Sequence, residues 1–94
     1  MVIAALEVRL RIPGAHSLKE KRRVIKSMKD RFAKLNLSVS EVDDNDKWQS
    51  AVLGLALVTN DAGFASSVMD RVILDMEDAY EAEMVDVKRE IIHL

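Results

Sequence analysis

Alternating apolar residues open the chain and predict a strand over residues 2–12. Every even position in this range is apolar, whereas Glu7, Arg9 and Arg11 lie between them. A period of two places one set of side chains on the buried face of a sheet and the other on the opposite face. The pair Pro13-Gly14 then interrupts the pattern and predicts the end of this strand.

A helix is predicted to begin at Ser17 and to end near Asn36. Ser17, followed three residues later by Glu20, forms a capping box that satisfies free amides at a helix start. Beyond it, apolar residues recur at spacings of three, four and seven, which indicates one buried stripe along a helix. The stripe consists of Leu18, Val24, Ile25, Met28, Phe32 and Leu35.

The middle of the chain predicts two strands joined by a polar turn. Residues 37–43 are rich in Val and Ser with charges toward the end, as is typical of an edge strand. Residues 44–49 are polar and predict the turn. Residues 51–59 are almost continuously apolar yet too short to cross a membrane, which favours a central strand.

The last third of the chain predicts a second helix and a closing strand. Asn60 or Asp61 caps the helix, which ends near Glu81. Its buried stripe is predicted to be Ala65, Val68, Met69, Val72, Met76, Ala79 and Tyr80. Residues 84–94 alternate, with Val85, Val87 and Ile91 on the apolar side; Arg89 breaks this set, either at a bulge or as a long stem lying along the surface.

The order strand, helix, strand, strand, helix, strand predicts an α+β, ferredoxin-like βαββαβ fold. Right-handed crossovers then place both helices on one face of a four-stranded antiparallel sheet, with the first and third strands at its centre. A chain of 94 residues is long enough for one hydrophobic core only. We therefore expect a single domain spanning residues 1–94.

The composition narrows the possible chemistry. The chain contains no cysteine, which excludes disulfides, thiolate metal sites and a cysteine nucleophile. There is no signal-peptide pattern and no run of apolar residues long enough to span a membrane. We therefore expect a cytoplasmic protein that does not interact with membranes.

Charge is strongly segregated between the two predicted helices, although the net charge of the whole chain is only −2. Residues 17–36 carry eight Lys and Arg against two acidic residues, a net charge of +6, whereas residues 61–83 carry seven acidic residues against one Arg, a net charge of −6. One interpretation is ion pairing between neighbouring helices. The other is a basic helix that presents cations to phosphates, and the two are compatible because eight cations around one helix cannot all face one partner.

Other polar residues carry weaker signals. His16 precedes a helix N-terminus, where an anion is favoured, but an exposed loop residue beside the capping serine is the favoured interpretation. The turn at residues 43–46 lacks the glycine and distal glutamate of a calcium loop and predicts a solvated turn. The only other histidine is His93, so we expect neither a metal site nor a cofactor. Trp48 precedes the third strand, where packing is the favoured role and base stacking the alternative.

The sheet face opposite the helices is predicted to be apolar and free of aromatic residues. Sheets of this topology that bind RNA place stacking aromatics on that face, and none is available here. A strip of small apolar residues instead favours a protein interface such as a homodimer. Its predicted members are Ile3, Ala5, Val52, Gly54 and Ala56; the alternative is that long side chains such as Arg9 cover the strip.

Several motifs together resemble the bacterial YlxP-like family. They are the run His16-Ser17-Leu18-Lys19-Glu20-Lys21-Arg22, then Ser38-Val39-Ser40-Glu41-Val42, then Trp48-Gln49 with Ala51-Val52-Leu53-Gly54. The resemblance spans the chain and implies a ferredoxin-like fold. The family has no established function or catalytic residues, and in many bacteria its genes lie among those for transcription elongation, translation initiation and ribosome maturation.

Two functions are therefore expected as alternatives, and neither is enzymatic. The first is binding of ribosomal or other structured RNA, with phosphates contacted by His16, Lys19, Lys21, Arg22, Arg23 and Lys26. The second is a homodimeric interaction or regulatory module that uses the open sheet face. An acylphosphatase-like enzyme is disfavoured because the arginine-bearing, glycine-rich loop of that class is missing between the first strand and the first helix.

Overall fold

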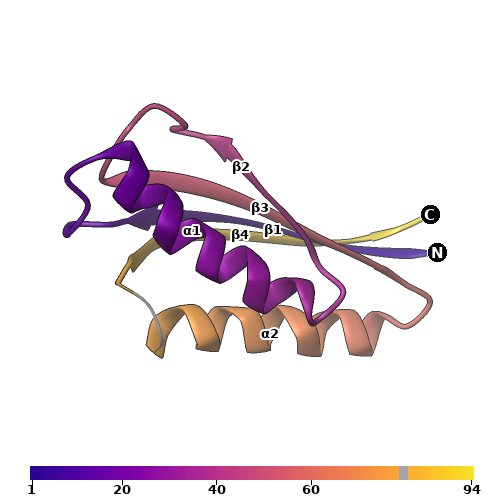
Figure 1. Ribbon diagram of the computed structural model, residues 1–94. Helices are drawn as coiled ribbons and strands as arrows, with labels where there is room; N and C mark the ends of the chain where they lie inside the picture. Colours follow the sequence, from indigo (N-terminus) through magenta and orange to yellow (C-terminus); the bar gives the residue numbers. More distant parts are fainter. Residues whose placement is uncertain (79–80) are drawn as a thin grey trace.

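The predicted order of elements is confirmed. The structure is a computed structural model that describes residues 1–78 and 81–94. The elements are β1 (Val2–Arg11), α1 (Leu18–Ala33), β2 (Ser38–Asp43), β3 (Ser50–Thr59), α2 (Ala62–Asp78) and β4 (Glu83–His93). Both helices lie against one face of the sheet, and the two termini meet at one end of it (Figure 1).

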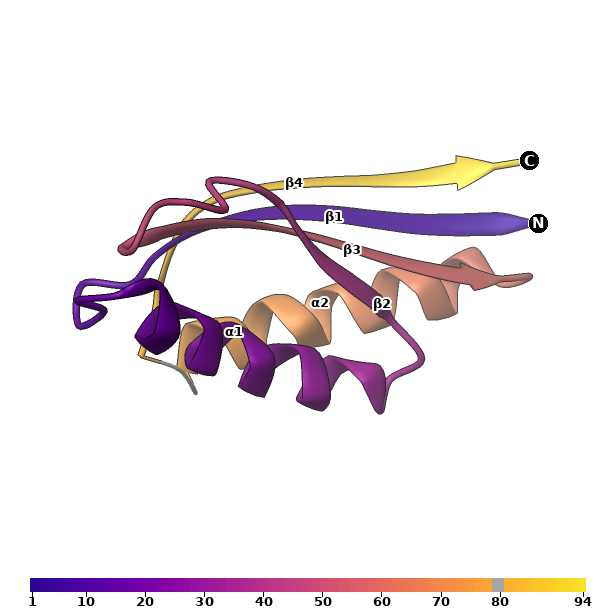
Figure 2. The same cartoon turned by 45° about the horizontal axis from the view of Figure 1, so that its top comes forward.

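The four strands form an antiparallel sheet in the order β2-β3-β1-β4, with β1 and β3 at its centre as predicted. Strand β1 pairs along its whole length with β3, from Val2 opposite Thr59 to Arg11 opposite Ser50. Strand β2 is shorter and pairs only with residues 52–56 of β3. The sheet forms one layer and the helices the other (Figure 2), which leaves the opposite sheet face open.

The core lies between the sheet and the helices. The even-numbered residues of β1 point into it, and their partners on β3 include Leu53, Leu55 and Leu57. From α1 and α2, Met28, Phe32, Met69, Val72 and Met76 are almost completely buried. The alternation in the strands and the helical periodicity of α1 and α2 thus place the apolar faces of the sheet and the helices against each other. Ala79 and Tyr80, predicted to extend the stripe of α2, lie outside the described residues.

Strand β4 departs from its predicted alternation. The register against β1 shifts between Arg9 and Leu10, which leaves Val85 as an extra residue. The prediction that Val85 shares the apolar side with Val87 is therefore wrong, because this bulge turns Val85 outward and leaves it 59% exposed. Arg89 is not at the bulge; its guanidinium reaches α2 and contacts Asp70 at 2.7 Å.

Candidate nucleic-acid interface

The start of α1 is fixed by the predicted capping box. The Glu20 amide donates to Ser17 Oγ at 3.1 Å, and the His16 amide donates to Glu20 Oε2 at 2.8 Å. The carboxylate of Glu20 therefore already occupies the position at the helix N-terminus that favours an anion. The His16 side chain is exposed beside it, and this geometry makes His16 the weakest member of the predicted phosphate-binding set.

One side of α1 pairs with acidic residues on or just beyond α2. Arg31 Nε lies 3.5 Å from Asp75, and a guanidinium nitrogen of Arg23 lies 3.7 Å from Glu81. The interpretation of ion pairing between the helices is correct for these two cations. The Arg23–Glu81 pair is largely exposed, so its contribution to stability is small. Arg23, predicted to contact phosphates, is directed toward the acidic helix.

The other side of α1 carries a separate row of cations, which we call the basic stripe. It consists of Lys19, Arg22, Lys26 and Lys29. Their spacing of three, four and three residues places them on one face of a helix. Lys26 pairs within the helix with Asp30 at 3.3 Å. Within residues 1–78 and 81–94, the other three have no ion pair.

A groove of about 430 Å³ runs between the basic stripe and the edge strand β2. Arg22, Ile25, Lys26 and Lys29 line it from α1, and Ser40, Glu41 and Asn45 line it from β2 and the turn that follows. Positively charged side chains on one wall and hydroxyl and amide groups on the other form a surface suited to a phosphate backbone. Glu41 does not oppose this, since its carboxylate is engaged by Lys21.

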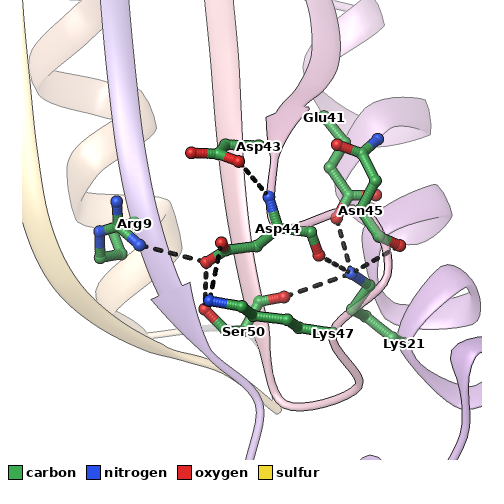
Figure 3. A network of polar contacts seen from close by, with 8 residues as sticks. All are labelled: Arg9, Lys21, Glu41, Asp43, Asp44, Asn45, Lys47 and Ser50. Carbon is green, nitrogen blue, oxygen red and sulfur yellow. Dashed lines mark hydrogen bonds and ion pairs between the residues drawn. The ribbon is translucent and has the colours of Figure 1, made fainter.

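Lys21 is not available to phosphates, so its predicted role is wrong. The side chain is fully buried, and its Nζ donates to Glu41 Oε2 at 2.7 Å, Asp44 O at 2.8 Å and Ser50 O at 3.2 Å (Figure 3). A buried ammonium is tolerated only when such partners satisfy it. The spacing of Lys21 from Val24, Ile25 and Met28 already places it on the buried face of α1, and this was the missed signal.

Asp44 is a second polar centre that the sequence did not reveal. Its carboxylate is almost buried and accepts from Ser50 Oγ, from Arg9 at 3.1 Å and from Lys47 at 3.3 Å (Figure 3). The prediction that this turn is merely solvated is therefore wrong for Asp44. The hydrogen bond from Ser50 holds the pKa of Asp44 below its ordinary value of 3.8; burial opposes this, and Lys47 and Arg9 act in the same direction as Ser50.

The rest of the turn is tied to the segment that leads into α1. Gln49 Nε2 donates to Ala15 O at 3.1 Å and to Pro13 O at 3.3 Å, and Gln49 O accepts from the Ile12 amide at 2.9 Å. Trp48, immediately before it, is 54% exposed. The favoured prediction, that Trp48 packs over the sheet edge, therefore accounts for at most about half of its surface.

The open sheet face is apolar near the termini and charged toward its other end. Ile3 and Ala5 are half-buried and Ala56 is exposed, as an interface strip requires. Gly54 lies beneath Val42, whose Cγ1 would be 2.9 Å from an added Cβ. Val52 is only 1% exposed, so its predicted place in the interface is wrong. Two exposed residues complete the strip: Val58 (58% exposed), which pairs with Ile3, and Ile92 (38%), which pairs with Ile3 from the other side.

Within residues 1–78 and 81–94, no group of three or more His, Asp or Glu side chains is placed to hold a metal ion. Neither described helix is long and apolar enough to cross a bilayer.

Comparison with known proteins places the chain among relatives of unknown function. Residues 3–89 match a family model described as "Protein of unknown function (DUF503)". The chain is 34% identical over 80 residues to "Uncharacterized protein YlxP" of Bacillus subtilis (strain 168), a match that covers 84% of this chain and 87% of that protein.

Solved structures resemble the chain in fold alone. The de novo designed protein Foldit4 matches with a TM-score of 0.56 and 14% identity over 98% of both chains. The designed ferredoxin-fold protein LFR1 1 matches with a TM-score of 0.53 and 12% identity, over all of this chain and 88% of that one. These matches support the ferredoxin-like βαββαβ architecture.

Proposed function

The chain belongs to the DUF503 family of proteins of unknown function, and we propose that it binds structured RNA, without catalysis, through the basic stripe of α1. The observation that carries this proposal is the division of the cations of α1. Arg23 and Arg31 pair with the acidic side of the molecule, whereas Lys19, Arg22 and Lys29 have no ion pair in the part of the chain that the structure describes.

The dimensions of the basic stripe suit a nucleic acid backbone. Lys29 lies ten positions after Lys19, which corresponds to about 15 Å along a helix. The basic stripe is therefore long enough to contact several successive phosphates of one strand. Ribosomal RNA, the partner suggested by the family resemblance, is one structured RNA of this kind.

The acidic residues of α2 support one orientation of binding. They lie beside α1, on the same face of the sheet as the basic stripe, and they repel a polyanion. An RNA is therefore attracted to the groove between α1 and β2 and excluded from the side of α2. Such directional attraction is compatible with the acidic pI of about 5.6 of the whole chain.

The experiment compares two double charge reversals that change the net charge equally. Arg22→Glu/Lys29→Glu alters the basic stripe, and Arg71→Glu/Lys88→Glu alters exposed residues of α2 and β4. Filter binding to ribosomal subunits and to an rRNA hairpin is measured from about 50 to 200 mM salt. We expect steeply salt-dependent binding of the wild type, at least a tenfold loss for the first variant and a smaller loss for the control. The absence of wild-type binding at low salt, or equal losses for both variants, would falsify the proposal.

A homodimer through the open sheet face is a second candidate, favoured by the exposed row Val58, Ile3 and Ile92. Three strands of ten or eleven residues, about 33 Å long, and the six-residue β2, about 20 Å long, lie about 4.8 Å apart and give a face of roughly 570 Å². This area is somewhat below the roughly 800 Å² that each partner contributes to a standard interface. The charged end carries both signs, with Arg9 beside Asp86 and Glu7 beside Lys88, so a second copy meets complementary charges.

Sedimentation velocity over a concentration series tests the dimer. Val58→Glu is compared with Leu74→Glu, because Val58 and Leu74 are 58% and 59% exposed and lie on opposite layers. We expect the wild type and Leu74→Glu to dimerise at high concentration and Val58→Glu to remain monomeric. A monomeric wild type at all concentrations would exclude this candidate.

A further inference from the structure

Trp48 lies in a turn that hydrogen bonds and ion pairs hold in place. Asp44 adopts a positive φ of 60°, and its buried carboxylate holds Ser50, Lys47 and Arg9. The Lys47 amide donates to Asp44 O at 3.0 Å, and Lys21 reaches the turn from α1 through Asp44 O. Arg9 and Lys21 therefore hold the start of the six-residue segment 44–49, and hydrogen bonds between Gln49 and the segment 12–15 hold its end. The segment that carries Trp48 is preorganised.

The same turn exposes the largest side chain of the protein. Trp48 is the only tryptophan, and 54% of its surface is accessible. Isolated exposed apolar residues are common, but tryptophan usually satisfies its indole N–H and buries its rings. An aromatic ring on a preorganised turn loses little conformational entropy when it binds a flat partner.

The turn is continuous with the basic stripe. Asn45 lines the groove together with Arg22, Lys26 and Lys29. Gln49, next to Trp48, is bonded to Pro13 and Ala15, which precede the Ser17 cap of α1. Figures 1 and 2 both place the β2–β3 turn and the start of α1 at the same end of the molecule. A strand that follows the groove toward the N-terminus of α1 therefore reaches the turn that carries Trp48.

From this arrangement we propose that Trp48 stacks on an unpaired base of an RNA whose backbone lies along the basic stripe. The inference rests on the proposed RNA binding and specifies its ligand as a helix that ends in, or is interrupted by, unpaired nucleotides. Phosphate contacts by the stripe are independent of sequence and of pairing. Stacking requires a base that is free to leave its helix, so Trp48 supplies the preference for loops and bulges.

The single tryptophan makes the test direct. The full chain is titrated with an RNA hairpin that has an unpaired loop and with a fully paired RNA duplex of the same number of phosphates, while tryptophan fluorescence and filter binding are recorded. We expect the hairpin to quench Trp48 strongly and to bind more tightly than the duplex. Trp48→Leu is expected to lose about tenfold in affinity for the hairpin but little for the duplex, since stacking on one base accounts for such a factor. Trp48→Phe, which keeps a ring, retains most of the preference for the hairpin.

The outcomes separate this inference from the proposed function. Arg22→Glu/Lys29→Glu is expected to lose both RNAs, because the basic stripe contacts phosphates in either. If wild type and Trp48→Leu prefer the hairpin to the same degree while the stripe variant loses both RNAs, the role of Trp48 is overturned and RNA binding stands. If the wild type binds neither RNA, both proposals fail. Urea midpoints of all variants establish that each is folded.

Discussion

Lys21 shows how one residue can belong to a basic helix and yet take no part in its charged surface. Its side chain is fully buried, and its ammonium donates hydrogen bonds to the Glu41 carboxylate on β2, to Asp44 O in the turn and to Ser50 O at the start of β3. These contacts tie α1 to β2 and to the β2–β3 connection. A buried ion pair of this kind has a small net effect on stability, but removal of one partner leaves the other uncompensated.

We expect Lys21→Met to lower the free energy of unfolding by about 3 kcal/mol, because it keeps the apolar stem and leaves the Glu41 carboxylate and several carbonyl groups without a donor. Urea denaturation measures this loss. Lys26→Met is the control: Lys26 is exposed and pairs with Asp30 within α1, so we expect this variant to lose less than about 0.5 kcal/mol. Similar losses for both variants would contradict the structural role of Lys21.

The ionisation of the single residue Asp44 makes the stability of the folded protein depend on pH. Its pKa in the folded protein lies below 3.8, chiefly because Ser50 donates a hydrogen bond to the carboxylate. A lowered pKa means that the folded state favours the ionised form. The resulting stabilisation is complete above the pKa of the unfolded chain and is lost as the pH falls through the pKa of the folded state.

Asp44→Asn isolates this charge, because asparagine also tolerates the positive φ of 60° at this position. We expect the variant to be less stable than the wild type at neutral pH and the difference to shrink once the pH falls below 3.8. Urea denaturation over a pH series measures the difference. Asp46→Asn, in the same turn but exposed, is expected to differ little from the wild type throughout. A gap for Asp44→Asn that persists in acid would show that the charge is not the cause.

At the scale of elements, the caps define the helices as sharply as the apolar stripes do. Ser17 and Asp61 accept from the amides of Glu20 and Phe64, both at 3.1 Å, and Asn36 follows α1 with a positive φ of 60°. Side-chain oxygens at the start and a left-handed residue after the end satisfy groups that a helix cannot pair internally. The basic stripe depends on this, because Lys19 lies in the first turn of α1 and Arg22 follows directly after it.

We expect Ser17→Ala to destabilise the protein by about 1 kcal/mol, since the variant loses the acceptor for the Glu20 amide. Thermal and urea unfolding measure this effect. Ser27→Ala, at an exposed position in the middle of α1, is the matched control and should be neutral or slightly stabilising, because alanine has the higher helix propensity. If both variants behaved alike, the capping box would not be limiting for α1.

The sequence predicted the elements because each follows a period that belongs to one secondary structure. The alternation in β1 and the capping box survive unchanged, and the buried stripe of α1 differs from its prediction by including Lys21. What failed depended on partners distant in the chain: the outward turn of Val85 follows from a register shift against β1, and the burial of Asp44 follows from Arg9 and Ser50. Lys19, Arg22 and Lys26 of the basic stripe were in the predicted phosphate-binding set, whereas Lys29 was missed. Local sequence could not separate these cations, because the positions of the acidic partners decide which of them remain unpaired.

For the whole molecule, the important quantity is the separation of charge and not its sum. The net charge is −2, but residues 17–36 carry +6 and residues 61–83 carry −6. The basic stripe faces away from the acidic helix, toward β2. A polyanion therefore experiences attraction on one side and repulsion on the other, and the balance depends on how far each field extends through the salt solution.

The range of these fields predicts different salt behaviour for two single neutralisations. Asp46 lies next to Asn45, which lines the groove, whereas Asp78 ends α2 on the far side of α1. The Debye length is about 8 Å at 150 mM ionic strength and about 30 Å at 10 mM. We expect Asp46→Asn to raise the affinity for an RNA hairpin at both ionic strengths and Asp78→Asn to raise it only at the lower one, each by a few-fold, as filter binding would measure. If Asp78→Asn raised the affinity as much as Asp46→Asn at 150 mM, RNA would have to approach α2 closely. That result would contradict the basic stripe as the interface.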